Sequence, residues 1–253
     1  MKLLKKQFLS LKKEIGILIE KDKANYGYLQ NYLYFFYAPL FTYTESIILL
    51  CENKNYISAS VIMRSLVEAH IKIIYHQTDS KHRLASLVKL DFEERIKEIN
   101  KIRELIKKHP NLESVDAKSL FSFKRLKELE SINKTNLEAV LKGNQFADKY
   151  HKKLFDKATE CDKEFVKNAK SGHFEEMYIT MYGYLSLPTH LNFAGLEMFK
   201  EKQNKKDSKI LITEAIGICV AYVKDLYENN VISGKIPKLI TEIENLLKSQ
   251  ESF

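Results

Sequence analysis

The sequence predicts an all-α protein, an antiparallel helical bundle with a charged helical insertion, and three observations lead to this class. Along most of the chain, apolar residues recur every three or four positions, which is the spacing of one face of an α-helix. Glycine (8 residues) and proline (4 residues) are scarce in the 253-residue chain. The abundance of Lys, Glu, Leu and Ile is typical of long helices rather than of a turn-rich β-protein.

The first 79 residues are expected to form four helices. We place them over residues 2–22, 24–37, 40–52 and 57–77. Pro39 ends or kinks the second helix, because proline lacks the backbone N–H that a helix interior needs. The polar turn at residues 53–55 ends the third helix. The fourth helix is apolar around most of its circumference, so we expect it to lie at the centre of the bundle.

After residue 79, helices alternate with less regular pieces. Asp79 is expected to cap a long helix over residues 81–108, which Pro110 follows. The pattern then loosens, and Asn133 is expected to cap a helix that runs through Lys142. Further helices are expected over residues 145–170, 174–185 and 210–227, with a helical segment reaching residue 198. Residues 233–237 lead into a final amphipathic helix that ends near residue 248.

We expect the whole chain, residues 1–253, to form a single helical domain. Its core would be the bundle of residues 1–79 and 173–253. The charged stretch 80–172 would be a helical insertion packed against that core. A chain of this length is ample to bury such a core.

The cysteine pattern and the hydropathy exclude several protein classes. Three cysteines lie far apart in the sequence, which fits neither a disulfide framework nor a zinc site and favours the reducing cytoplasm. Residues 25–44 carry no charge, but their many tyrosines predict a buried pair of aromatic helices rather than a membrane span. The basic N-terminus leads into an amphipathic repeat, so we expect no signal peptide.

Motifs for metal ions and cofactors are missing, so we expect neither. The chain lacks the Glu-x-x-His pairs of di-iron bundles, the His-Glu-x-x-His of zinc enzymes and glycine-rich phosphate loops. The net charge of +8 points toward nucleic acid, since clustered Lys and Arg release counterions from phosphates. The lysines are spread among 33 acidic residues, however, and an ordinary solvated surface is the alternative interpretation.

Polar residues on the helix over residues 57–77 are the first candidates for a functional site. At 100° per residue, Arg64 lies at the edge of the buried face with Tyr75, and Glu68 follows about one turn later. A partly buried charge is unfavourable unless it is paired, and such pairs often stabilise less than apolar residues would. An Arg64–Glu68 ion pair therefore indicates a site. The alternative is that the pair only ties this helix to a neighbour.

The segment of residues 182–190 is the second candidate. Pro188 interrupts a helix there, and the freed backbone N–H groups favour anions. Three side chains that can donate or accept hydrogen bonds lie in the segment, those of Tyr182, Ser186 and His190. The alternative is that Ser186 caps a helix and that His190 packs against a tyrosine.

Two short motifs carry a resemblance to a known family. The motifs are Arg64-Ser65-Leu66-Val67-Glu68 and Tyr182-x-x-Leu185-Ser186-x-x-x-His190. They resemble the two signatures of domain-of-unknown-function family 5677, bacterial helical proteins of which some are linked to phage defence. The resemblance covers residues 40–80 and 178–200. It implies one polar pocket formed by four side chains, those of Arg64, Glu68, Ser186 and His190.

A second pattern, Arg64-x5-His70, is similar to the Arg-x4–6-His motif of the HEPN superfamily. Helical dimers of that superfamily include metal-independent ribonucleases of toxin and antiphage systems. The resemblance implies that a histidine is the acid-base and that an arginine stabilises the scissile phosphate. The chain departs from the pattern at Ser65, where Asn is frequent. Arg64 and His70 also lie about 120° apart on a straight helix.

Two hypotheses for the function remain open. The first is a bacterial defence-associated effector that acts on RNA, as a toxin-type ribonuclease or by binding. In it, His190 or His70 is the acid-base, and Arg64 contacts the phosphate. Tyr182 and Tyr75 would bind the substrate, and the partners would be RNA and a cognate antitoxin or phage component.

The second hypothesis is a non-catalytic module. The same polar residues would then form a structural or ligand-sensing network, while exposed faces bind a partner protein. A homodimer is a further expectation, because the uncharged, tyrosine-rich surface near residues 26–43 exceeds what one small core covers.

Overall fold

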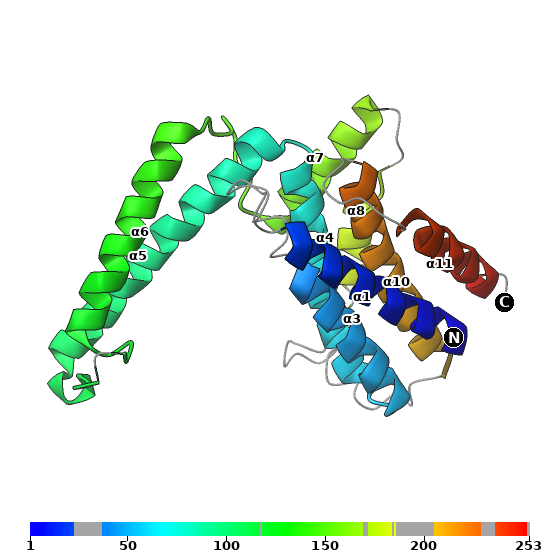
Figure 1. Ribbon diagram of the computed structural model, residues 1–253, viewed down its shortest axis with the longest axis horizontal. Helices are drawn as coiled ribbons and strands as arrows, with labels where there is room; N and C mark the ends of the chain where they lie inside the picture. The colour runs from blue at the N-terminus through cyan, green and yellow to red at the C-terminus, as the bar shows by residue number, and fades with distance from the viewer. Residues whose placement is uncertain are drawn as a thin grey trace. The chain divides into compact units, whose positions relative to one another are not determined.

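The computed structural model confirms the all-α class, since every regular element among the described residues is a helix (Figure 1). The described residues are 1–22, 37–116, 118–168, 172–183, 185, 205–228 and 236–251. The α-helices are α1 (Lys2–Asp22), α3 (Tyr37–Glu52), α4 (Tyr56–Gln77), α5 (Ala85–Lys108), α6 (Phe123–Gly143), α7 (Leu154–Lys167), α8 (Phe174–Met177), α10 (Lys205–Glu228) and α11 (Ile236–Glu251). Shorter elements are the π-helices η2 (Ser80–Leu84) and η4 (Tyr178–Gly183) and the 3-10 helix η3 (Pro110–Leu112).

The chain divides into two compact units. The first unit comprises Met1–Tyr75 and His151–Phe253, and the second unit is His76–Tyr150. The boundaries predicted from the sequence, a core of residues 1–79 and 173–253 with an insertion over 80–172, stay a prediction.

Most of the predicted helices are confirmed. The predicted helices over residues 2–22 and 57–77 correspond to α1 and α4, and the last two predicted helices correspond to α10 and α11. Asp79 is the N-cap of η2, which leads directly into α5, and its carboxylate accepts a hydrogen bond from the backbone N–H of His82 at 3.4 Å. The predicted helix over residues 24–37 and the interruption at Pro188 lie outside the described residues.

Predicted helix starts at residues 133 and 145 lie far from the observed ones. Asn133 does not cap a helix but lies inside α6, where its Nδ2 donates to the backbone oxygen of Leu129 at 2.7 Å. An Asn side chain can bond one turn back, which satisfies it within a helix. The helix predicted over residues 145–170 begins only at Leu154. The reason is that the backbone N–H of Ala147 donates to the Ser86 hydroxyl at 3.0 Å instead of to a backbone carbonyl of a helix.

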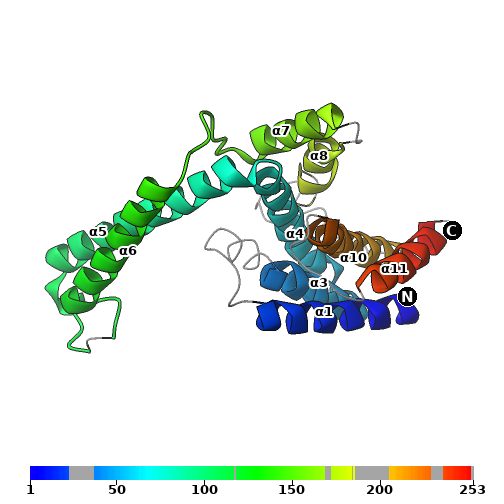
Figure 2. The same cartoon turned by 45° about the horizontal axis from the view of Figure 1, so that its top comes forward.

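In the first unit, α1 and α3 run antiparallel. Two ion pairs fix this direction, because Lys5 near the start of α1 bonds Glu52 at the end of α3 at 2.6 Å, while Lys12 bonds Glu45 at 2.5 Å. On the buried side of α1, Phe8 stacks on Phe41 with ring centroids 5.2 Å apart. In addition, α11 packs against α1, and α10 packs against α3 and α11 (Figure 2).

Thr44 and the cysteines are buried in the core of the first unit. The Thr44 hydroxyl lies 3.0 Å from the backbone oxygen of Leu40 and 3.0 Å from Sγ of Cys219. All three cysteines, the third being Cys161, are free and buried. Burial raises the pKa of the Cys51 thiol to about 11 and that of Cys219 to about 12, so both thiols stay protonated at neutral pH.

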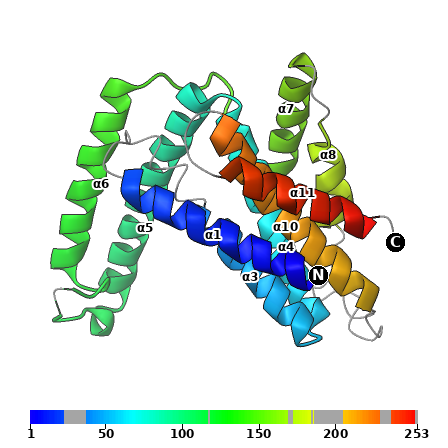
Figure 3. The same ribbon diagram turned by 45° about the vertical axis from the view of Figure 1, so that its right-hand side comes forward.

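The second unit contains a hairpin of α5 and α6, which run side by side (Figure 3). Its hydrophobic core is formed by Ile99, Ile106 and Leu126. At the edge of this core, Glu130 accepts from Arg103 at 2.5 Å and from Lys134 at 2.7 Å. Across the ranges described above, no helix has both the length and the apolar character that spanning a bilayer requires.

Replacement of Leu126 by Ala tests the packing of this hairpin. Leu126 is fully buried, so the lost methyl groups and the resulting cavity should destabilise the hairpin by about 2–5 kcal/mol. Leu141→Ala, at a position on the same helix that is 46% exposed, is the matched control and should change stability by less than about 0.5 kcal/mol. Hydrogen exchange of the α5 and α6 amides measures the effect locally. Equal protection in the two variants would contradict this packing.

Candidate functional site

The candidate site in the first unit is built around α4. The apolar positions of α4 are spread around the helix, and Met63, Leu66 and Ile71 are fully buried. Polar residues on such a helix must find partners among its neighbours. Among these neighbours, α7 and α8 lie beside the C-terminal half of α4 (Figure 2), and η4 contacts α4 at Arg64.

Arg64 of α4 is joined to Tyr182 of η4. Its Nη2 donates to the Tyr182 hydroxyl at 2.9 Å, and its guanidinium carbon lies 4.8 Å from the centre of the same ring. This cation–π contact orients the guanidinium as well as binding it. The structure therefore brings together two of the residues that the sequence singled out.

Tyr182 is one member of a row of three rings, which we call the aromatic stack: Phe155, Tyr178 and Tyr182. The rings of Tyr178 and Tyr182 are stacked, with centroids 5.0 Å apart and planes 17° apart. Phe155 of α7 continues the row at 5.3 Å from Tyr178. Both tyrosines lie in the π-helix η4, a rare conformation that is frequent at functional sites. The guanidinium of Arg64 closes one end of the row.

Glu68 does not pair with Arg64 among the described contacts. Instead it accepts a hydrogen bond from Lys72, one turn further along α4, at 2.5 Å. Both side chains are partly exposed, so this pair contributes little to stability. The predicted Arg64–Glu68 ion pair is thus replaced by two separate interactions.

A buried lysine lies next to this pair. Lys157 of α7 is only 5% exposed, and its ammonium lies 5.2 Å from the ring centre of Tyr75. Burial and, to a lesser extent, the ammonium of Lys72 lower the pKa of Lys157 to about 8, whereas Cys161 and Glu68 oppose the shift. A substantial fraction of Lys157 is therefore neutral just above physiological pH.

His70 and Tyr75 are interior residues. His70 is 6% exposed, and its ring packs against Phe174 with centroids 5.8 Å apart. Its Nδ1 has no hydrogen-bond partner in the described part of the chain. Burial lowers the pKa of His70 to about 4, so the ring is neutral at pH 7. Tyr75 is fully buried, and its hydroxyl accepts from the backbone N–H of His151 at 3.1 Å.

The remaining predicted site residues, Ser186 and His190, lie outside the described residues. The pocket of four polar side chains therefore stays a prediction. The described residues include no group of three or more His, Cys, Asp or Glu side chains that could hold a metal ion.

Sequence reasoning missed Phe155, Tyr178 and Lys157. A signal was available for Tyr178, because it lies four residues before Tyr182 and i, i+4 pairs share a helix face. Phe155 and Lys157 come from a distant segment, and only the tertiary fold brings them to α4.

A protein-family model matches most of the chain. The model of a family described as a family of unknown function, DUF5677, matches residues 30–207. No curated protein and no solved structure matches the chain.

The protonation of His70 gives a direct test of its burial. The unfolded chain should bind a proton at the ordinary histidine pKa near 6.5, whereas the folded chain should not do so until about pH 4. The free energy of unfolding should therefore decrease as the pH falls from about 6.5 to about 4, by about 3 kcal/mol in total.

NMR of the histidine ring protons measures this, with His70→Gln identifying the His70 signal. The signal should stay constant from pH 8 to pH 5. A midpoint between pH 6 and pH 7 would show that the ring is in contact with water.

Proposed function

The chain belongs to the family of unknown function DUF5677, and we propose that it binds single-stranded RNA on its aromatic stack, as an effector of bacterial defence. The observation that carries the RNA part is the row of Phe155, Tyr178 and Tyr182, closed by the guanidinium of Arg64. The defence part is supported by the family resemblance of the two motifs.

Unpaired bases bind to proteins mainly by stacking on aromatic rings and on arginine planes. The stack offers this geometry in a partly exposed position, since Phe155 is 39% exposed and both tyrosines are partly accessible. Every base has a flat π-face, so such a surface tolerates many sequences. Double-stranded nucleic acid hides its faces and gains little from this surface.

Two exposed lysines lie just before Phe155 in the sequence. Lys152 and Lys153 immediately precede α7, are exposed, and take part in none of the ion pairs of the described residues. They are therefore available for phosphates next to a base that stacks on Phe155. Lys72 adds a further partly exposed ammonium on α4, already bonded to Glu68.

The proposal assigns no acid-base role to His70. A buried ring reaches no substrate hydroxyl, and with a pKa of about 4 it is a weak base that carries no proton to donate at pH 7. Within the proposal, any cleavage of RNA falls to His190, with Arg64 as the partner of the phosphate. Arg64 is held by Tyr182, so its guanidinium is fixed in position before RNA binds.

The rival hypothesis, a structural network, is favoured by the same Arg64–Tyr182 contact, because it ties α4 to η4. The two hypotheses differ in what is lost when the contact is removed. A network loses stability first, whereas an RNA site loses affinity while the fold persists.

Removal of one ring from the stack should weaken RNA binding. Tyr178→Ala removes the central ring, and base stacking contributes about 1–3 kcal/mol per base, so the dissociation constant should rise by about 5- to 150-fold. Fluorescence anisotropy with a labelled 12-nucleotide single-stranded RNA measures this. The control is Tyr227→Ala on α10, which removes a tyrosine that is 36% exposed and lies outside the stack. Equal affinity of the two variants would refute the proposal.

Arg64→Ala and His190→Ala separate the two hypotheses. For an RNA site, Arg64→Ala should weaken RNA binding with the melting temperature unchanged within a few degrees. His190→Ala should abolish any cleavage of the same RNA, assayed with and without divalent metal, while binding persists. A large drop in melting temperature for Arg64→Ala, with RNA affinity of the wild type undetectable, would instead establish the structural network.

A further inference from the structure

The outer face of α1 combines lysines with exposed leucine and isoleucine. Lys2, Lys6 and Lys13 lie on this face together with Leu9 and Ile17, which are 51% and 52% exposed. The opposite face of α1 is buried in the bundle. Placed at 100° per residue, these five positions fall within a stripe of about 80°. The helix is therefore fixed in place by its inner face and presents a regular second face outward.

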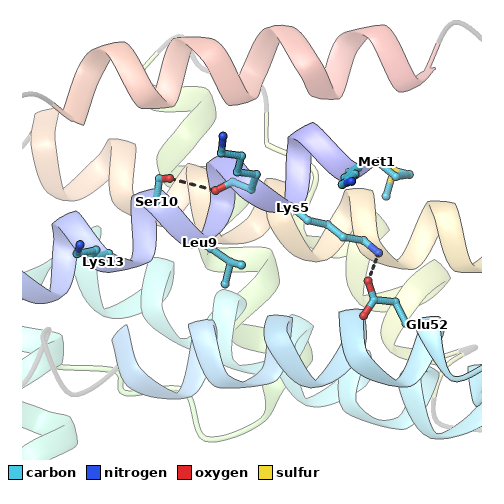
Figure 4. A pocket seen from close by; sticks show the side chains of 8 residues that line it. Met1, Lys5, Leu9, Ser10, Lys13 and Glu52 are labelled. Carbon is cyan, nitrogen blue, oxygen red and sulfur yellow. Dashed lines mark hydrogen bonds and ion pairs between the residues drawn. The ribbon is translucent and has the colours of Figure 1, made fainter.

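A groove runs along this face. It has a volume of about 730 Å³ and is lined by Met1, Lys2, Lys5, Lys6, Leu9, Ser10, Lys13 and Glu52 (Figure 4). Figure 4 shows Leu9 pointing from α1 toward the neighbouring helix, between Lys5 on one side and Lys13 on the other. The bond between Lys5 and Glu52 forms one end of the groove.

Two ion pairs between α1 and α3 flank exposed apolar side chains. Lys5–Glu52 and Lys12–Glu45 join α1 to α3 about two turns apart, and Leu9 lies between the two lysines on α1. On α3, Leu49 lies between the two glutamates and is 60% exposed. It is within about 60° of both around the helix axis. Leu9 lines the groove, and Leu49 is exposed on α3 about one turn before Glu52. Exposed apolar side chains of this kind are typical of a binding surface.

The groove has an excess of positive charge. Four lysines line it against one glutamate, and that glutamate is already bonded to Lys5. None of the ion pairs of the described residues involves Lys2, Lys6 or Lys13. Each of these three ammonium groups is therefore available to an acidic partner.

We propose that this groove binds an acidic amphipathic helix of a partner protein. A helix laid along α1 would place its apolar stripe on Leu9 and Leu49, and the acidic residues that flank the stripe would face Lys2, Lys6 and Lys13. The spacing of these lysines, four and seven residues along α1, repeats that of one helical face. Charge and apolar pattern thus specify the same type of ligand.

Two other ligands fit this surface less well. RNA gains nothing from aliphatic side chains, and the groove lining contains no aromatic ring on which a base could stack. A lipid bilayer is nearly flat on the scale of one protein, so it would not fill a groove between two helices. A helix, in contrast, is a rod of about 10 Å diameter and fills such a groove along its length.

Three synthetic peptides of 21 residues test the proposal. The first has leucines along one helical face and glutamates beside them. The second has the same leucines with lysines in place of the glutamates, and the third is a scrambled version of the first without an apolar face. Fluorescence anisotropy should show saturable binding of the acidic amphipathic peptide, at least about tenfold weaker binding of the scrambled peptide, and no binding of the basic peptide.

Charge reversal in the groove should reverse this preference. The double variant K6E/K13E should lose the acidic amphipathic peptide and bind the basic one, because attraction becomes repulsion at two positions. Both lysines are exposed and outside the described ion pairs, so circular dichroism should show an unchanged fold. The matched control is K238E/K248E, which makes the same charge change at two exposed positions of α11 and should leave all three affinities unchanged within about twofold.

A second pair of substitutions tests the apolar part. L9S/L49S keeps every lysine and should reduce the affinity for the acidic amphipathic peptide to that for the scrambled one. Equal binding of the scrambled and amphipathic peptides to the wild type would overturn the proposal. It would show that the lysines attract any acidic peptide, whether or not the peptide has an apolar face. The proposal also fails if K6E/K13E retains the acidic peptide. It fails as well if polyuridine RNA or vesicles with one-third anionic lipid bind the groove while the peptide does not.

Discussion

The arrangement of the first unit depends on the burial of α4, a helix of 22 residues with apolar side chains around most of its circumference. An unpartnered polar group in the interior is unfavourable, so a polar residue of such a helix is stabilised by a partner inside the protein. The hydroxyl of Tyr182 accepts a hydrogen bond from Arg64, and Glu68 accepts one from Lys72 at the edge of the helix, whereas Nδ1 of His70 has no partner among the described residues. The partner of Arg64 therefore comes from η4, whereas the partner of Glu68 comes from α4 itself.

Much of the fold could be predicted from the sequence, because helix formation there rests on local signals. The apolar period locates α1, α4, α10 and α11, and the Asp79 cap locates the start of the long helix that follows. The failures also have a physical reason. Asn133 satisfies itself within a helix, and Ser86 draws the backbone at Ala147 away from helical bonding. Neither hydrogen bond can be predicted from the spacing of apolar residues in the sequence.

The candidate site was predictable only in part. Arg64 and Tyr182 stand out in the sequence as polar groups within apolar surroundings, and the structure joins them. Their chemistry depends on what lies next to them in space. Phe155 extends the row of rings from a distant segment, and the burial of His70 removes its proton chemistry near neutral pH. Neither fact follows from spacing along a single helix.

The buried thiols of the first unit have a practical consequence. Thiols react with oxidants and with maleimides as thiolates, and a raised pKa keeps that form rare. Cys51 and Cys219 have such raised pKa values, and no cysteine of the chain lies on the surface. One cysteine introduced at an exposed position would consequently be the dominant reactive thiol. Fluorophores, spin labels and cross-linkers could then be attached at a chosen point without removing any native residue.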